Sequence, residues 1–255
     1  MGACTNRGLD IMIAATEITV VLSSNGSSVI DRLHCESPLT VRVDNSFRDG
    51  STTIPTLMIV NTAAGPLSGD EFSFSLHVAD GAQVRVRSVA AMLVQPGPSG
   101  DWSHFNTTIQ LGKNSSLDWC TEPLISVQGS RHRSLTKVDA HSTSRMYLSE
   151  SLLLGRSNEL SGDITLRQRI EVDGLSVLDH ETQHGTSALL GLGAHGPWRH
   201  MRSAVSLGEQ AAIEPESEVS LESVRGVFPI AQSCSLEIEC ATRSTTSQHN
   251  HETFR

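Results

Sequence analysis

The segment HETQH places two histidines and a glutamate at the spacing of a zinc-hydrolase motif. In that chemistry His180 and His184, one helical turn apart, would hold zinc, and Glu181 would activate the metal-bound water. The flanking residues do not favour a helix, because Leu175–Leu178 is typical of a strand and Gly185 follows the motif directly. We therefore keep a zinc-dependent hydrolase as an alternative hypothesis and favour the end of a strand.

Other catalytic motifs are weak or missing. Residues 191–196, GLGAHG, match the G-x-G-x-x-G pattern of a dinucleotide site. Such a site needs a preceding parallel strand and a long following helix, so a connector is the better interpretation. The chain has neither a phosphate-binding G-x-x-x-x-G-K-[ST] loop nor a G-x-S-x-G nucleophile elbow. We expect a protein that is not an enzyme.

The elements that must position these residues are strands, because apolar residues recur with a period of two over most of the chain. Short polar turns separate them, which predicts an all-β, mostly antiparallel protein with a sandwich-like or β-helical body. We expect one or two short helices in the region 185–207, a single β domain over residues 1–240, and a disordered tail over 241–255. The clearest strands are Thr16–Leu22, Leu57–Asn61, Glu71–Val78, Gln83–Val89 and Arg145–Leu154.

Composition narrows the function classes. A net charge of −9 argues against a nucleic-acid binder, and we interpret the basic cluster Arg131, His132, Arg133 and Lys137 as a solvated turn. No stretch approaches the ~20 apolar residues of a membrane helix, and no secretory signal is visible. Five irregularly spaced cysteines are typical of a reducing compartment. The expected location is the cytoplasm.

One turn is distinctive. The run LMIVNTAAGPLSGD ends a short apolar strand in small residues and places Asp70 at the start of the next strand. Asp80-Gly81 then reads as a β-hairpin turn, since both central residues of such a turn need positive φ. The first run resembles the signature turn of the UreD (UreH) family of urease accessory proteins. It keeps Gly65, Gly69 and Asp70 but lacks the paired glycines of the family.

Two later segments support the resemblance. LDWCTEPLISVQGSRHR (Leu117 to Arg133) and SESLLLGRSNELSGDITLRQRIEVDGLSVLDHE (Ser149 to Glu181) are similar to family segments in the family's order. The second contains the Leu-Gly-Arg element at Gly155 and Arg156, which we expect to form a structural turn with Gly65 and Gly69. The matches span roughly Pro38 to Glu181 and fade beyond about Gly185. They indicate an actinobacterial-like form of the family.

The resemblance implies a urease maturation chaperone. Family members act as a scaffold between apo-urease and the accessory protein UreF, which recruits the GTPase UreG, and they help to deliver nickel into urease. It also implies no tightly bound cofactor and only transient nickel. A carbohydrate-binding β-sandwich module is a third alternative, although three Trp and one Tyr are few for such a binder.

Four carboxylates lie in or beside the family-like segments. Asp70, Glu122, Glu150 and Glu159 allow two interpretations, which the sequence leaves open. They hydrogen-bond to turn amides or pair with an arginine such as Arg156, or they line a passage for a divalent ion. Exchangeable oxygen ligands suit transit better than thiolate cages do.

Overall fold

The computed structural model describes residues 11–185, 198–209, 211–212 and 214–242, and all regular elements within them are strands. The predicted all-β class is therefore confirmed. The strands are β1 (Ile13–Leu22), β2 (Ser28–Cys35), β3 (Leu39–Asp44), β4 (Arg48–Asp49), β5 (Thr52–Thr53), β6 (Thr56–Asn61), β7 (Glu71–Val78), β8 (Gln83–Ser88), β9 (Met92–Val94), β10 (Ser103–Leu111), β11 (Ser116–Cys120), β12 (Leu124–Ser126), β13 (Arg131–Ala140), β14 (Arg145–Leu154), β15 (Asp163–Val172), β16 (Leu175–His184), β17 (His200–Leu207), β18 (Glu216–Val219), β19 (Ser223–Ala231) and β20 (Cys234–Ala241).

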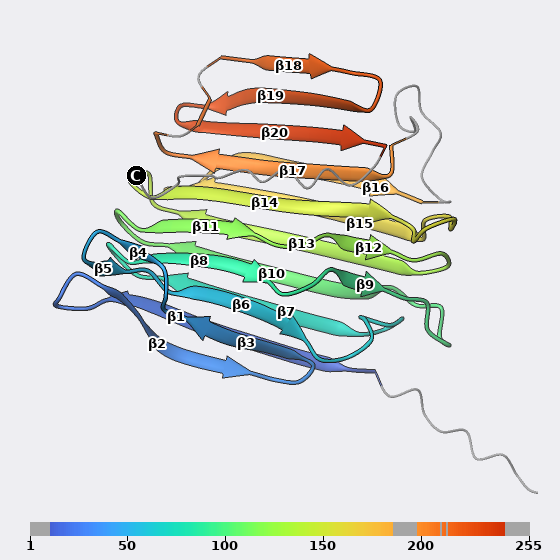
Figure 1. Ribbon diagram of the computed structural model, residues 1–255, viewed down its shortest axis with the longest axis horizontal. Helices are drawn as coiled ribbons and strands as arrows, with labels where there is room; N and C mark the ends of the chain where they lie inside the picture. Colours follow the sequence, from blue (N-terminus) through green and yellow to red (C-terminus); the bar gives the residue numbers. More distant parts are fainter. Residues whose placement is uncertain (1–10, 186–197, 210, 213, 243–255) are drawn as a thin grey trace, which may run out of the picture.

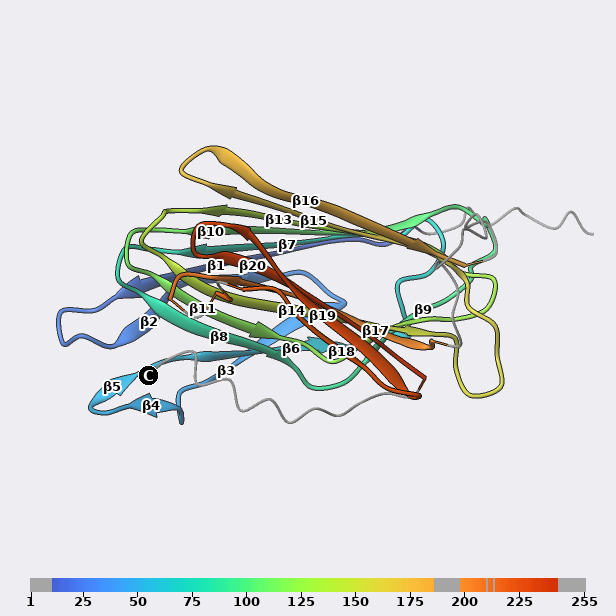
Figure 2. The same ribbon diagram turned by 90° about the horizontal axis from the view of Figure 1, so that it is seen from above.

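Two large sheets form the two layers of the body, which Figure 2 shows edge-on. One sheet, here sheet A, has the order β16-β15-β13-β10-β7-β1-β2. The other, sheet B, has the order β18-β19-β20-β17-β14-β11-β8-β6-β3 (Figure 1). The chain alternates between the layers, so that β7, β10 and β13 lie in sheet A while β8, β11 and β14 lie in sheet B. This winding gives the β-helical form of the predicted body.

The prediction of mostly antiparallel pairing was wrong for the centre of the molecule. Strands β1, β7, β10, β13 and β15 pair parallel in sheet A, and β6, β8, β11 and β14 pair parallel in sheet B. Antiparallel pairs lie toward the edges, as in β1–β2 and β15–β16. The reason is that each coil contributes one strand to each sheet, and successive coils run in the same direction.

The predicted hairpin at Asp80-Gly81 is instead a corner between the sheets, because β7 and β8 do not pair with each other. Gly81 has φ +71°, as a tight turn requires. Its N–H donates to the carbonyl of Lys113 at 2.8 Å, and the N–H of Lys113 donates to the Asp80 carboxylate at 2.8 Å. Corners of successive coils therefore hydrogen-bond to each other, which fixes the register of the winding.

The core fills the space between the sheets with inward-facing residues of alternating strands. Phe74 and Trp119 make an edge-to-face contact with ring centroids 5.5 Å apart, joining sheet A to sheet B. Phe72 and Phe105 pack similarly at 6.3 Å. Aliphatic side chains supply most of the remaining core, as the low aromatic content of 4% requires.

The helices expected over 185–207 are not found where the structure can test them. Residues 186–197, which include the G-x-G-x-x-G match, lie outside the described residues. The rest of that region forms β17, whose Val205 and Leu207 alternate into the core. The glycines that broke the apparent period all precede this strand. The tail from residue 243 on also lies outside the described residues, and the single-domain organisation stays a prediction.

Gly69 in the signature turn has a left-handed backbone conformation. Its φ is +87°, while a side-chain carbon added there would meet Ile11 only at ordinary van der Waals distance. The next residue, Asp70, is buried and holds the turn together. Its carboxylate accepts hydrogen bonds from the N–H of Leu67 at 2.8 Å and of Met12 at 3.0 Å.

We expect Gly69→Val to lower the free energy of unfolding by roughly 1–3 kcal/mol, because a β-branched residue is strained at positive φ. Thermal unfolding of the purified variant measures this directly. An unchanged melting midpoint would show that the turn relaxes to another conformation without cost.

Candidate functional site

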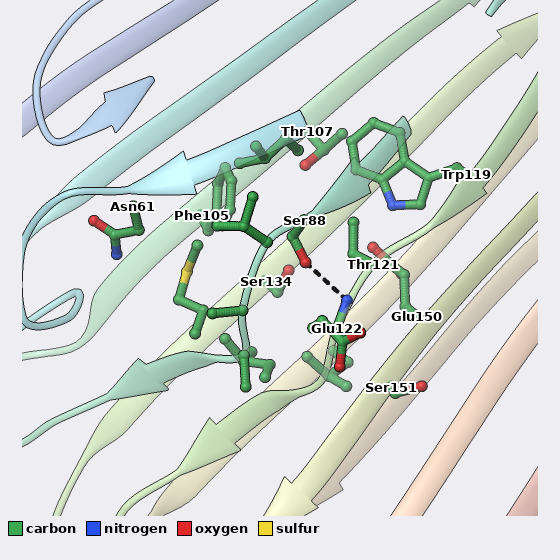
Figure 3. Close-up of a pocket in the computed structure, with 17 residues that line it drawn as sticks. Asn61, Ser88, Phe105, Thr107, Trp119, Thr121, Glu122, Ser134, Glu150 and Ser151 are labelled. Carbon is green, nitrogen blue, oxygen red and sulfur yellow. Dashed lines mark hydrogen bonds between the residues drawn. The ribbon is translucent and has the colours of Figure 1, made fainter. Parts of the chain in front are cut away.

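A break in sheet B opens the interior of the protein. Strands β8 and β9 are separated by residues 89–91, and β11 and β12 by residues 121–123. The neighbouring β14 continues without interruption and pairs with both β11 and β12. Pro123 lies within the second break and cannot donate a ladder hydrogen bond. The two breaks are tied together by the N–H of Glu122, which donates to Ser88 Oγ at 2.8 Å (Figure 3).

A cavity of about 130 Å³ lies behind this break, which is room for several water molecules. Its mouth is at the surface, where Val89 and Glu122 are exposed. Its inner wall comes from both sheets: Phe105, Thr107 and Ser134 belong to sheet A, and Trp119 and Glu150 to sheet B (Figure 3).

Glu150 is the acidic group of the cavity's inner wall. Its carboxylate accepts a hydrogen bond from Thr136 Oγ1 at 2.6 Å and another from Gln168 Nε2 at 2.8 Å. Gln168 Oε1 in turn accepts from Ser203 Oγ at 2.7 Å. The polar chain thus crosses between the sheets, from β13 and β15 in sheet A to β14 and β17 in sheet B. Burial raises the pKa of Glu150, and the two donated hydrogen bonds only partly offset this rise.

A second cavity, of about 30 Å³, shares Glu150 and Leu166 with the first. It extends toward β16 and β17, where His180, His184 and Ser203 contribute to its lining. Burial lowers the pKa of His180, which favours its neutral form. Glu150 therefore lies where two cavities with mostly apolar walls meet. The oxygen atoms that these cavities offer are the Glu150 carboxylate and the hydroxyls of residues such as Thr107, Ser134 and Ser203.

The HETQH segment cannot form a zinc protease site in this fold. It lies on β16, where side chains alternate between faces and residues rise ~3.3 Å each, so four residues separate the two histidines by ~13 Å. His180 and His184 face the second cavity, whereas Glu181 lies on the opposite, outer face beside Arg167. The zinc-hydrolase alternative was therefore wrong, and the interpretation as a strand is confirmed.

Two of the four predicted carboxylates line the first cavity, namely Glu122 and Glu150. The other two make the turn and ion-pair contacts of the alternative interpretation. Asp70 holds the signature turn as described above. Glu159 forms an ion pair with Arg156 at 2.6 Å and accepts the N–H of Gln128 at 2.9 Å. A role for either of these two in ion passage stays a prediction.

The predicted turn residues behave differently from one another. Gly65 has Leu67 N 3.3 Å from the position of an added side-chain carbon, so the turn approaches itself closely there. Gly155 combines φ +73° with a position 2.5 Å from the carbonyl oxygen of Glu159, and only glycine fits. Sequence reasoning did not single out Gly97, where an added carbon would come within 2.9 Å of Ser68.

The partners of Glu150 were missed, although the sequence carries a signal for them. On β15 the inward row reads Ile164, Leu166, Gln168, Ile170, Val172, with one polar residue among aliphatic ones. On β14 the row Met146, Leu148, Glu150, Leu152 has the same form. A polar residue within an otherwise apolar alternating row indicates a buried polar contact, since such a group needs a hydrogen-bond partner.

The described residues contain no group of three or more His, Cys, Asp or Glu side chains arranged to hold a metal ion. Within the same ranges, no helix is long and apolar enough to cross a bilayer. Fold and site together define an all-β, β-helical protein with a mostly apolar cavity between its sheets and the carboxylate of Glu150 on the inner wall of that cavity.

Comparisons with known proteins identify the family. The family model for the UreD urease accessory protein matches residues 14–246. The chain belongs to this family. It is 34% identical over 215 residues to the urease accessory protein UreD of Streptomyces coelicolor, covering 81% of each chain. The corresponding protein of Streptomyces avermitilis is 31% identical over 196 residues, covering 76% of this chain and 74% of the relative.

A relative from Saccharopolyspora erythraea, named urease accessory protein UreD 2, is 30% identical over 176 residues, which cover 61% of that protein. The predicted resemblance to an actinobacterial form of the family is thus confirmed. The family match extends well past residue 185, where the motifs quoted from the sequence ended.

Proposed function

We propose that this protein is a non-enzymatic chaperone of urease maturation, which helps to deliver nickel into apo-urease in the cytoplasm. In this proposal it acts with the accessory protein UreF, which connects it to the GTPase UreG, and it binds no cofactor tightly. Membership of the UreD family supports the general role. The observation that carries the nickel proposal is Glu150, an ionisable carboxylate at the junction of two interior cavities.

A few oxygen groups in the otherwise mostly apolar cavity walls would suit a cation that binds only transiently. Glu150 and Glu122 supply carboxylate oxygens, and Thr107, Ser134 and Ser151 supply hydroxyls. These ligands are few, and all of them are hard oxygen donors. A divalent ion would therefore exchange rapidly rather than remain bound. Glu122 at the mouth and Glu150 deep inside would offer successive negative charges along the path.

The proposal is tested by reconstitution. Cognate urease subunits are expressed in a urease-free host with UreF, UreG and the remaining accessory proteins, with or without this chain, in nickel-supplemented medium. We expect urease made without the chain to be soluble but to hold severalfold less nickel per active site, measured by metal analysis of the purified enzyme. Full nickel loading in its absence would contradict the proposal.

A further inference from the structure

The basic cluster, which the sequence predicted to be a solvated turn, lies instead on strand β13. Its side chains therefore have a fixed arrangement on one face of a sheet. Arg131, Arg133 and Lys137 are exposed on the outer face of β13, while His132 between the two arginines points inward and is fully buried. Because side chains alternate on a strand, all three cations lie on the same face of sheet A. With the neighbouring Trp102 they form a surface that we name the basic platform.

Trp102 holds the two arginines in place. The guanidinium carbon of Arg133 lies 4.6 Å from the centre of its ring, and that of Arg131 lies 4.9 Å away. Both distances are within the range of a cation–π contact. Arg131 also donates to the carbonyl of Gly100 at 3.3 Å. These contacts reduce the side-chain entropy that the arginines would lose on binding a partner.

The strands beneath the platform are fixed by a buried contact. Ser103 Oγ and His132 Nδ1 lie 2.9 Å apart and join β10 to β13 directly under the arginines. Both residues are completely buried, and burial lowers the pKa of His132 to about 3, so the imidazole is neutral at physiological pH. The positive charge of the platform therefore comes from its arginines and lysine alone.

The cations of the platform lack carboxylate partners among the described residues, unlike other cations on the same face. Arg32 pairs with Glu17 at 2.7 Å, and Arg167 pairs with Asp179 at 2.7 Å. Arg169 also contacts Asp179, at 3.4 Å. In a protein of net charge −9, two arginines that contact a tryptophan and have no salt-bridge partner among the described residues are a local concentration of positive charge. Such a concentration attracts an acidic surface and steers its approach.

An exposed apolar side chain lies on the same face of sheet A, three strands away from Arg133 and beyond Glu71. In the parallel register, Arg133 is opposite His104, His104 is opposite Glu71, and Glu71 is opposite Ile13. Ile13 is 72% exposed at the end of this row, and the preceding Ile11 is 56% exposed. Trp and Arg are the residues most enriched at the energetic centres of protein interfaces. The platform thus presents the residue types that anchor protein interfaces, and an exposed apolar side chain lies farther along the same face.

We infer that the basic platform is a docking surface for an acidic patch of another protein of the urease maturation complex. The guanidinium groups would bind partner carboxylates, to which their planar fork is matched, and Trp102 would pack against the partner's side chains. Nucleic acid is the less favoured ligand, because the charge of the whole protein repels a polyanion. The inference rests on the proposed function, since it takes the partner from that complex.

The test uses the full chain, affinity-tagged and co-expressed with cognate urease subunits and accessory proteins. The variant is Arg131→Glu with Arg133→Glu. Its matched control is Arg42→Glu with Arg48→Glu, which changes the net charge equally at two exposed arginines on β3 and β4. We expect the platform variant to capture at least tenfold less of one partner, while the control captures as much as wild type. Wild-type capture should weaken as salt rises, because screening acts on exposed charges.

Melting midpoints of both variants within 2–4 °C of wild type, which corresponds to about 1 kcal/mol, would show that folding is intact. Equal capture by wild type and platform variant would overturn the inference and leave the proposed function standing. No capture of any maturation protein by wild type would overturn the proposed function and the inference with it. Binding of a labelled single-stranded RNA that only the platform variant loses, with protein capture unchanged, would assign the platform to nucleic acid instead.

Discussion

Urease matured in the presence of the Glu150→Gln variant is expected to hold about tenfold less nickel at early times than urease matured with wild type. The substitution keeps the shape of the side chain and an oxygen that can accept from Gln168, replaces the other oxygen by an NH2 that can donate to the Thr136 hydroxyl, and removes the charge. A tenfold effect corresponds to 1.4 kcal/mol. This is well below the ~4 kcal/mol between two unit charges 4 Å apart at an effective dielectric constant of 20.

The Glu150→Gln variant should not be less stable than wild type. This result would separate a role of Glu150 in nickel passage from a role in stabilising the fold. Burial raises the folded-state pKa of Glu150 above the ordinary glutamate value of about 4.3. The folded protein therefore binds more protons than the unfolded chain between these two pKa values, and wild-type stability falls as the pH rises through that window. The glutamine side chain does not titrate, so the Glu150→Gln variant does not lose stability in this window. The melting midpoint of the variant minus that of wild type should therefore increase between pH 4 and pH 8.

Glu159→Gln is the matched control, since Glu159 pairs with Arg156 and is not among the residues that line the cavity. We expect it to leave nickel loading unchanged. The measurement that compares the two variants is nickel per urease active site at several times after nickel addition. Full loading with a stable Glu150→Gln variant would exclude a passage role for Glu150. Equal losses in both variants would show that the path does not follow the cavity.

Alternation in the sequence predicted the strands well because it follows directly from the pleat. Glu71–Val78 and Arg145–Leu154 match β7 and β14 at both ends. Pairing could not be predicted in the same way, since a period of two says which face a residue takes and nothing about the strand beside it. Asp80-Gly81 shows the difficulty, because Gly81 supplies positive φ to a corner between two sheets just as a glycine does in a hairpin turn, whereas Asp80 does not have the positive φ that the hairpin turn also needs.

The candidate site was predicted in part, for an equally physical reason. Motif resemblance selected Glu150, but the cavity arises where breaks in two parallel coils stack, and no single segment encodes that stacking. Asp70 and Glu159 lie in similar motifs and still serve turns. The residues beside these carboxylates in the sequence do not reveal whether a carboxylate accepts turn amides or faces a cavity.

Gly155→Ala is expected to destabilise the protein by about 3 kcal/mol or more. Its φ of +73° gives a side chain roughly 1–2 kcal/mol of strain. An added carbon would also lie 2.5 Å from the carbonyl oxygen of Glu159 and 2.8 Å from that of Leu160, and overpacking of this kind adds roughly 1–3 kcal/mol. At 2–4 °C per kcal/mol for a chain of this size, the melting midpoint should fall by about 6–12 °C.

Gly174→Ala isolates the contribution of the clash. Gly174 has nearly the same φ, +78°, but nothing lies within 4 Å of an added carbon. Gly174→Ala should therefore be destabilised only by the backbone strain, which is roughly 1–2 kcal/mol.

The effect of Gly155→Ala matters for the site because Gly155 follows β14 directly, and its N–H donates to the carbonyl of Ser126 on β12 at 2.9 Å. This contact closes the coil just beyond the break that opens the cavity, so Gly155→Ala should also reduce nickel loading. Equal midpoints for the two variants would show that the loop from 155 to 162 moves aside at no cost.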